Sequence, residues 1–204
     1  MAKRKRRDTE PPSIVPRPEA SGPSDEAESA AARRWKWWPL RPEARFLIVF
    51  LVVLAASFAL LAWTPVNDHV IEPFTAQIAK VSGATLRALG QPVTRVGTAL
   101  RSPRFAVNIR NGCNGVEAMV ILLAAIVAFP APWRARLAGL GIGAVAIQLV
   151  NLIRVVALFL TGAYLPRFFD TSHTVVWQTL VILSAVLVWI LWAQRVVPRR
   201  SPAA

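Results

Sequence analysis

Residues 137–162 read LAGLGIGAVAIQLVNLIRVVALFLTG, the longest apolar run in the chain, and carry a single charged side chain, Arg154. At 1.5 Å per residue, a helix over this run is long enough to cross the ~30 Å hydrocarbon core of a bilayer. Gln148, Asn151 and Arg154 recur every three residues and therefore share one face of that helix. Such a polar face is directed toward a bundle interior or a water-filled cleft; the alternative is that Arg154 snorkels to the membrane surface.

Three further apolar runs, at residues 46–63, 116–133 and 174–193, complete the predicted membrane domain. Of the 204 residues, 54% are hydrophobic and 17% are charged, and the formal net charge is +13. A soluble nucleic-acid-binding domain could not keep such apolar runs in water, so we expect no nucleic-acid partner. The predicted fold class is an all-α, polytopic membrane helical bundle with four transmembrane helices.

Basic residues beside these runs predict the orientation of the chain. Arg45 precedes the first run, Arg134 and Arg136 lie between the second and third, and Arg195 follows the fourth. A four-span chain brings these flanks to one side, which the positive-inside rule makes the cytoplasmic side of the plasma (inner) membrane. The predicted outer loop, residues 64–115, disagrees, since it carries Lys80 and five arginines, but the rule weakens for loops that approach sixty residues. We therefore expect both termini to be cytoplasmic and the first span to be a retained anchor.

Composition divides the chain into three predicted parts. Residues 1–45 are expected to be a disordered, basic cytoplasmic tail that ends in an interfacial anchor of tryptophan and arginine side chains. Residues 46–195 are the expected membrane-embedded catalytic domain, and residues 196–204 are a second basic cytoplasmic tail. In the outer loop, apolar residues close to helical spacing predict an amphipathic helix on the outer membrane surface, with Lys80 and Arg87 reaching lipid phosphates; a plain polar loop is the alternative.

Cys113 is the only cysteine, and it lies in the polar, turn-forming sequence of residues 111–115, just before the second span. Asn111 or Asn114 is expected to cap that span, and unpaired backbone N–H groups with nearby Arg154 predict a lowered thiol pKa. His173 directly precedes the fourth span. The topology brings these three side chains to the same depth on the outer side. The alternatives are a buried structural cysteine and a histidine that is merely interfacial.

A cysteine, a histidine and an arginine in one site suit acyl transfer. Cys113 would attack a peptide carbonyl and form a thioester, His173 would act as general base and acid, and Arg154 would stabilise the oxyanion. Glu117, one turn beyond Cys113, is expected to hold Arg154 in an ion pair. One cysteine and two histidines exclude a cysteine-rich zinc site and a histidine-rich metal cage, and we expect no metal and no cofactor.

Three segments resemble the exosortase/archaeosortase family of membrane transpeptidases: residues 111–117 (NGCNGVE), residues 151–155 (NLIRV) and His173 at the last span. The resemblance covers about residues 105–193, and the short length is most similar to the compact exosortase H group. It implies that Cys113 is the nucleophile, Arg154 the transition-state stabiliser and His173 the acid/base. Asn114, Glu117 and Asn151 are the expected supporting residues.

The resemblance also implies a class of substrate. Such enzymes cleave C-terminal sorting signals, which consist of a short motif, a transmembrane segment and a basic cluster, on the extracytoplasmic side of the membrane. Membrane lipids and a lipid or surface acceptor are the other expected partners. Simple proteolysis without transfer stays open, and so does a non-enzymatic alternative: a small polytopic scaffold or transporter subunit in which Arg154 binds an anionic ligand.

Overall fold

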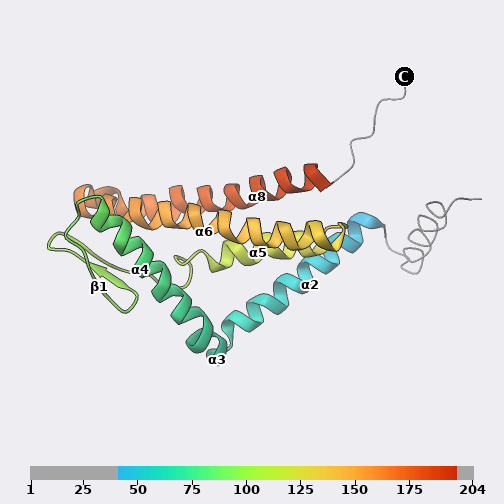
Figure 1. Ribbon diagram of the computed structural model, residues 1–204, viewed down its shortest axis with the longest axis horizontal. Helices are drawn as coiled ribbons and strands as arrows, with labels where there is room; N and C mark the ends of the chain where they lie inside the picture. Colours follow the sequence, from blue (N-terminus) through green and yellow to red (C-terminus); the bar gives the residue numbers. More distant parts are fainter. Residues whose placement is uncertain (1–40, 197–204) are drawn as a thin grey trace, which may run out of the picture. The chain divides into compact units, whose positions relative to one another are not determined.

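The computed structural model describes residues 41–196, and the predicted tail regions 1–40 and 197–204 lie outside them. An all-α membrane bundle is confirmed (Figure 1). Its apolar helices are α2 (Pro42–Ala62), α5 (Val116–Ala128), α6 (Trp133–Tyr164) and α8 (Trp177–Val196). Because Pro42 suits the first helical turn, α2 begins inside the region that the sequence assigns to the tail.

Three helical segments within residues 41–196 are long and apolar enough to cross a membrane: Pro42–Ala62, Trp133–Tyr164 and Pro166–Val196. The remaining apolar helix, α5, has 13 residues and is about 20 Å long. It ends well before the predicted residue 133 because Pro130 and Pro132 follow it. The predicted count of four full spans therefore stays a prediction.

Helix α5 lies against α2, α6 and α8 and supplies the centre of the bundle. Leu122 and Ile126 of α5 are buried against Ile147 of α6 and Ala185 of α8. The large apolar side chains on the outer faces of α2, α6 and α8 are exposed, as expected of surfaces that contact lipid.

Between α2 and the sheet, the chain forms α3 (Thr64–Val66), the π-helical turn η1 (Asn67–Ile71) and α4 (Glu72–Ala88). Helix α4 confirms the predicted helix in the outer loop, and the polar-loop alternative is wrong. The buried face of α4 consists mainly of small and polar residues at helical spacing, namely Thr75, Ala79, Ser82 and Leu86. This face packs on α6 and the sheet, so α4 covers the end of the bundle. Its place on a membrane surface stays a prediction.

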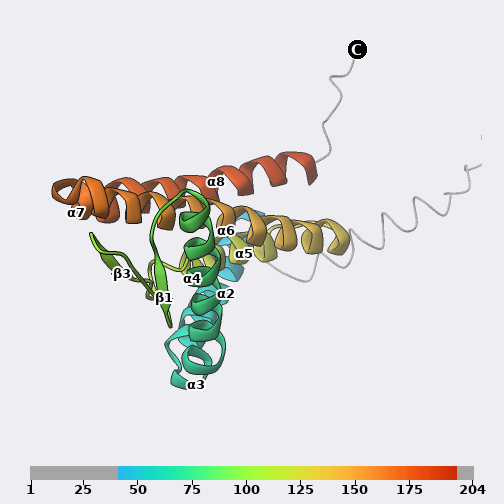
Figure 2. The ribbon, with the colours of Figure 1, turned by 60° about the vertical axis from the view of Figure 1, so that its left-hand side comes forward.

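A small antiparallel sheet follows α4 and has the strand order β1 (Thr94–Val96), β2 (Ala99–Arg101), β3 (Ala106–Asn108). Leu100 of β2 is opposite Val107 and is fully buried in a core that includes Phe159 of α6. Strand β1 lies beside α4, and β3 lies on the side of α7 (Phe169–Thr171) (Figure 2). Strands of three residues have too short a pattern to be found in the sequence.

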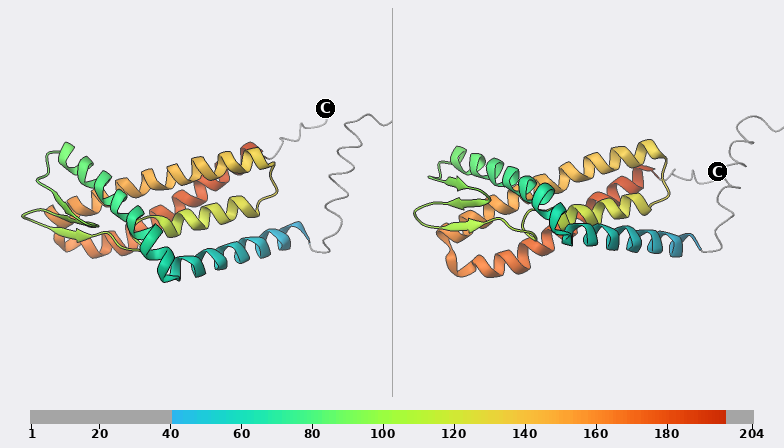
Figure 3. Two further views of the ribbon diagram at one scale, coloured as in Figure 1. Left: turned by 60° about the horizontal axis from the view of Figure 1, so that its bottom comes forward. Right: turned by 90° about the horizontal axis from the view of Figure 1, so that it is seen from below.

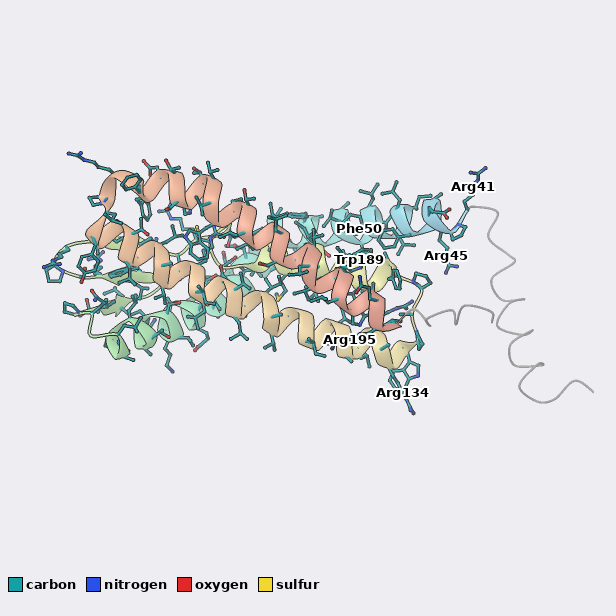
Figure 4. The ribbon with its side chains drawn as sticks, turned by 90° about the horizontal axis from the view of Figure 1, so that it is seen from above. Arg41, Arg45, Phe50, Arg134, Trp189 and Arg195 are labelled. Atoms are coloured by element: carbon teal, nitrogen blue, oxygen red, sulfur yellow. The ribbon has the colours of Figure 1, made fainter. Side chains whose placement is uncertain are left out.

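The chain enters α8 through three short turns: η2 (Pro166–Phe168), α7 and the π-helical η3 (Ser172–Val176). These turns, α4 and the sheet lie at the end of the bundle opposite the start of α2 (Figure 3). The basic flanks lie at the other end, where Figure 4 shows Arg41, Arg45, Arg134 and Arg195. The predicted grouping of these flanks is therefore observed.

Candidate active site

The loop of residues 109–115, called the cysteine loop below, holds Cys113 between β3 and α5. Gly112 and Gly115 adopt left-handed conformations with φ of 84° and 76°, which other residues rarely adopt. The Gly112 N–H donates to Glu117 Oε1 over 2.7 Å, and the Val116 N–H donates to Asn114 Oδ1 over 3.1 Å. The start of α5 therefore ties down both sides of the cysteine.

Asn114 is fully buried and joins the cysteine loop to two other elements. Its Nδ2 donates to Thr75 Oγ1 of α4 over 3.0 Å and to Asn111 Oδ1 over 3.2 Å. Its backbone carbonyl accepts from Gln148 Nε2 of α6 over 3.4 Å. The N-cap of α5 is Gly115, without a side-chain cap, so the predicted capping by Asn111 or Asn114 is wrong; Asn114 instead joins the loop to α4, α6 and the first residue of α5.

The predicted polar stripe of α6 lies directly behind the cysteine loop. Gln148 contacts Asn114, and Asn151 packs so closely on Gly115 that an added Cβ would lie 2.9 Å from Asn151 Cγ. Arg154 is 2% exposed, and its Nη1 donates to the Gly112 carbonyl over 3.2 Å. Because the guanidinium is buried inside the bundle, the snorkelling alternative is wrong.

The structure brings the three predicted catalytic side chains together. Cys113 Sγ lies 2.8 Å from His173 Nε2, although 60 residues separate the two along the chain. His173 belongs to η3, and its ring stacks on Phe169 with centroids 5.9 Å apart and planes 11° apart. Arg154 Nη2 lies 4.0 Å from Cys113 Sγ and donates to Gln178 Oε1 over 3.4 Å.

Burial raises the pKa of the Cys113 thiol; the positive charge of Arg154 lowers it, and the negative charge of Glu117 raises it further. The lowered pKa predicted from the sequence is therefore wrong, because the loss of solvation outweighs the charge of Arg154. The raised pKa favours the neutral thiol over the thiolate in the contact between Cys113 Sγ and His173 Nε2.

Glu117 does not have its predicted partner. Its carboxylate accepts from the Gly112 N–H, and no ion pair between Glu117 and Arg154 is formed in the described region. The two side chains instead hold Gly112 from both sides, Glu117 at its N–H and Arg154 at its carbonyl oxygen. His69, the other histidine, lies 3.0 Å from the Pro65 carbonyl and does not line the cavity beside Cys113.

A cavity of about 340 Å³ opens beside Cys113 and His173. Its walls come from the β3 region, the cysteine loop, α6 and α7, and most of them are apolar. Val107, Ile109, Val155, Leu158 and Phe169 are the apolar lining residues. In residues 41–196, no group of three histidine, cysteine or acidic side chains is arranged to hold a metal ion.

Three residues that contact the predicted site residues were not themselves predicted: Gln178, which contacts Arg154; Thr75, which contacts Asn114; and Phe169, which contacts His173. Gln178 had a detectable signal, because an amide one turn beyond His173 in an apolar span needs a polar partner. Thr75 and Phe169 had none, since a threonine in an amphipathic helix and a phenylalanine near a membrane surface are both ordinary.

Comparison with protein families matches the chain to a family described as transmembrane exosortase (Exosortase_EpsH), over residues 37–192. The matched region is more than half of the chain and contains Cys113, Arg154 and His173. Neither the curated proteins nor the solved structures give a match.

Proposed function

The chain belongs to the transmembrane exosortase family, and on this premise we propose that it is a membrane-embedded cysteine peptidase or transpeptidase whose nucleophile is Cys113. The observation that carries the proposal is the 2.8 Å contact between Cys113 Sγ and His173 Nε2, beside a buried arginine. A thiol and an imidazole in direct contact are the pair that thiol acyl transfer requires.

In the first half of the reaction, His173 takes the Cys113 proton as the sulfur attacks the substrate carbonyl carbon. An S–C bond forms, and the resulting oxyanion lies on the carbon bonded to the sulfur. When the C–N bond breaks, His173 passes its proton to the departing amine, leaving a thioester on Cys113. This route starts from a neutral thiol, which is consistent with the raised pKa of Cys113.

Arg154 supplies the positive charge for the oxyanion. Its Nη2 is 4.0 Å from the sulfur, so an oxygen on the carbon bonded to that sulfur comes within its reach. The contacts of Arg154 with Gly112 and Gln178 fix the guanidinium before substrate binds. A preformed donor of this kind needs no rearrangement during the reaction.

In the second half, an acceptor amine or hydroxyl, or water, attacks the thioester carbonyl. His173 removes the proton of the attacking group, the C–S bond breaks, and the thiol of Cys113 is restored. An acceptor other than water makes the reaction a transfer, and water makes it a hydrolysis.

The substrates would be proteins with C-terminal sorting signals, on which exosortases act in general. Strand β3 offers a way to hold the cleaved segment. Ile109 N–H donates to the Thr98 carbonyl, and Ser102 N–H donates to the Phe105 carbonyl, so residues 105, 107 and 109 bond toward β2. The N–H and C=O groups of Ala106 and Asn108 therefore point to the free edge, where an extended peptide can add as a strand.

We assign the site to the extracytoplasmic side of the inner membrane. His173 belongs to η3, which lies at the end of the bundle opposite the start of α2 (Figure 3), whereas the labelled arginines lie at the other end, which the positive-inside rule assigns to the cytoplasm (Figure 4). A substrate anchored by one transmembrane segment would then present its outer end to Cys113 without leaving the bilayer.

Trapping with hydroxylamine tests the thioester. Hydroxylamine attacks a thioester and leaves a hydroxamate at the new C-terminus, which mass spectrometry of an epitope-tagged substrate detects. We expect the hydroxamate with the native enzyme. A carboxylate or acceptor-linked terminus that is unaffected by hydroxylamine would contradict a thioester route.

A further inference from the structure

A second cavity, of about 270 Å³, lies between α2, α5 and α8 and is separate from the active site. Its lining is apolar throughout and contains neither Cys113, Arg154 nor His173. Each of the three helices contributes side chains to the lining, among them Phe46 and Phe50 of α2, Ile121 and Ala125 of α5, and Ile182 and Trp189 of α8.

The packing of α2 explains this cavity. No residue of α2 is buried, and the helix packs mainly along α5. Helix α5 thus forms the floor, while α2 and α8 form the walls. Figure 4 shows Phe50 and Trp189 on the two walls, and the rings of Phe46 and Trp189 bridge them with centroids 6.0 Å apart.

The cavity lies toward the basic end of the bundle. Arg45 directly precedes Phe46, and Arg195 is six residues beyond Trp189, about 9 Å farther along the axis of α8. Figure 4 shows Arg41, Arg45 and Arg195 at this end, from the two helices that form the walls. Positive charge therefore lies next to an apolar space.

We infer that this cavity binds an anionic phospholipid, with one acyl chain between α2 and α8 and the phosphate at the arginines of the two helix ends. Inside a bilayer, an acyl chain gains little hydrophobic free energy by entering the cavity, but an empty cavity forfeits dispersion contacts. A lipid chain is therefore the default occupant. The headgroup selects among lipids, because guanidinium groups pair with phosphate and attract anionic lipid.

Size and charge both disfavour a transmembrane helix of a substrate as the occupant. From Ile182 to Trp189 the cavity extends about 10 Å along α8, which fits within one leaflet of a ~30 Å core. A membrane-spanning helix is about 30 Å long, roughly three times the length of the cavity along α8, so most of such a helix would lie outside the cavity. A segment with a basic end would also be repelled by the arginines.

Native mass spectrometry of the purified full chain tests this inference without any activity assay. The chain is incubated with equal amounts of phosphatidylglycerol and phosphatidylcholine that carry the same acyl chains. We expect the one-lipid adduct to favour phosphatidylglycerol at least fivefold, roughly the effect of one basic residue near an anionic surface. Equal adducts of the two lipids would overturn the inference.

Substitutions of the arginines test where the lipid headgroup binds. The double substitution Arg41→Gln and Arg195→Gln should lower the lipid preference at least about fivefold. Arg134→Gln is the matched control, because Arg134 stacks on Trp133 of α6, which lines no part of the cavity, and it should keep the native preference. An unchanged preference in the double variant would overturn the inference.

Filling the cavity gives an independent test. Ala125→Phe should remove the adducts of both lipids while the melting temperature stays near that of the native chain. Ile121→Trp, at a more exposed lining position, serves if Ala125→Phe does not fold. A photo-crosslinking amino acid in place of Phe50 should capture lipid in membranes; capture of a protein segment there would contradict a lipid occupant.

Discussion

Arg154 donates from Nη1 to the carbonyl oxygen of Gly112 over 3.2 Å, one residue before the cysteine in the chain. Its other terminal nitrogen faces the Cys113 sulfur at 4.0 Å. One buried guanidinium therefore fixes the backbone of the cysteine loop and places positive charge beside the Cys113 sulfur. Arg154 therefore contributes both to the structure of the loop and to the electrostatic environment of Cys113.

Arg154→Lys should abolish most processing of tagged substrates, by at least about 100-fold, the usual cost of losing a preorganised oxyanion donor. Lysine keeps the charge but cannot contact Gly112, Cys113 and Gln178 through separate nitrogens. Arg134→Lys, at an exposed site on the same helix, is the control. Native turnover in Arg154→Lys would contradict the assigned role.

The reactivity of Cys113 should depend on pH through its two charged neighbours. Because the thiol pKa is raised, alkylation of the native enzyme should accelerate as pH rises beyond neutrality. Glu117→Gln removes a charge that raises this pKa but keeps an acceptor for the Gly112 N–H, so alkylation near pH 7 should become faster.

Arg154→Gln provides the opposite test, because its charge lowers the same pKa. Alkylation near pH 7 should slow in this variant, and one pKa unit corresponds to a tenfold change in thiolate. The measurement is the alkylation rate of the single cysteine against pH. Shifts of the same sign in both variants would contradict the electrostatic account.

Gly115→Ala should lower the free energy of unfolding by at least about 1–2 kcal/mol. The backbone of Gly115 has a left-handed conformation, and the Cβ of an alanine there would press on Asn151. Gly141→Ala is the matched control on α6, where a Cβ meets nothing within 4 Å. That change should be neutral or stabilise the helix. Thermal unfolding in detergent measures both, and equal melting temperatures would contradict the packing argument.

The main features of the site were predictable because polar groups are costly in a membrane. Arg154 and its stripe stand out in an apolar helix, and topology brings Cys113 and His173 to the same level. The partner of Glu117 was not predictable, since it depends on the left-handed turns at Gly112 and Gly115. The raised pKa of Cys113 was missed for a related reason: burial follows from tertiary packing.

For the fold, the helices could be predicted from the sequence, but the packing of α4 and the small sheet could not. Long apolar runs indicated the bundle, and periodicity indicated α4. The buried face of α4 was not foreseen, because small residues such as Ala79 and Ser82 pack closely without a hydrophobic signal. The sheet escaped prediction because its strands have three residues each and derive their stability from α4 and α6.

Ala106→Pro should reduce substrate processing, because proline removes an N–H from the free edge of β3 without breaking a bond to β2. Arg95→Pro makes the same change at the outward position of the opposite edge strand, β1, and should process substrate normally. Alkylation of Cys113 should be native in both variants. Equal processing by the two variants would contradict peptide addition to β3.

The central claim is tested most directly by following C-terminally anchored proteins, tagged on the outer side of the tail, in cells with native enzyme or Cys113→Ser. Immunoblots should show shortened substrate only with the native enzyme, at equal abundance of the two proteins. Undiminished shortening with Cys113→Ser would contradict Cys113 as the nucleophile.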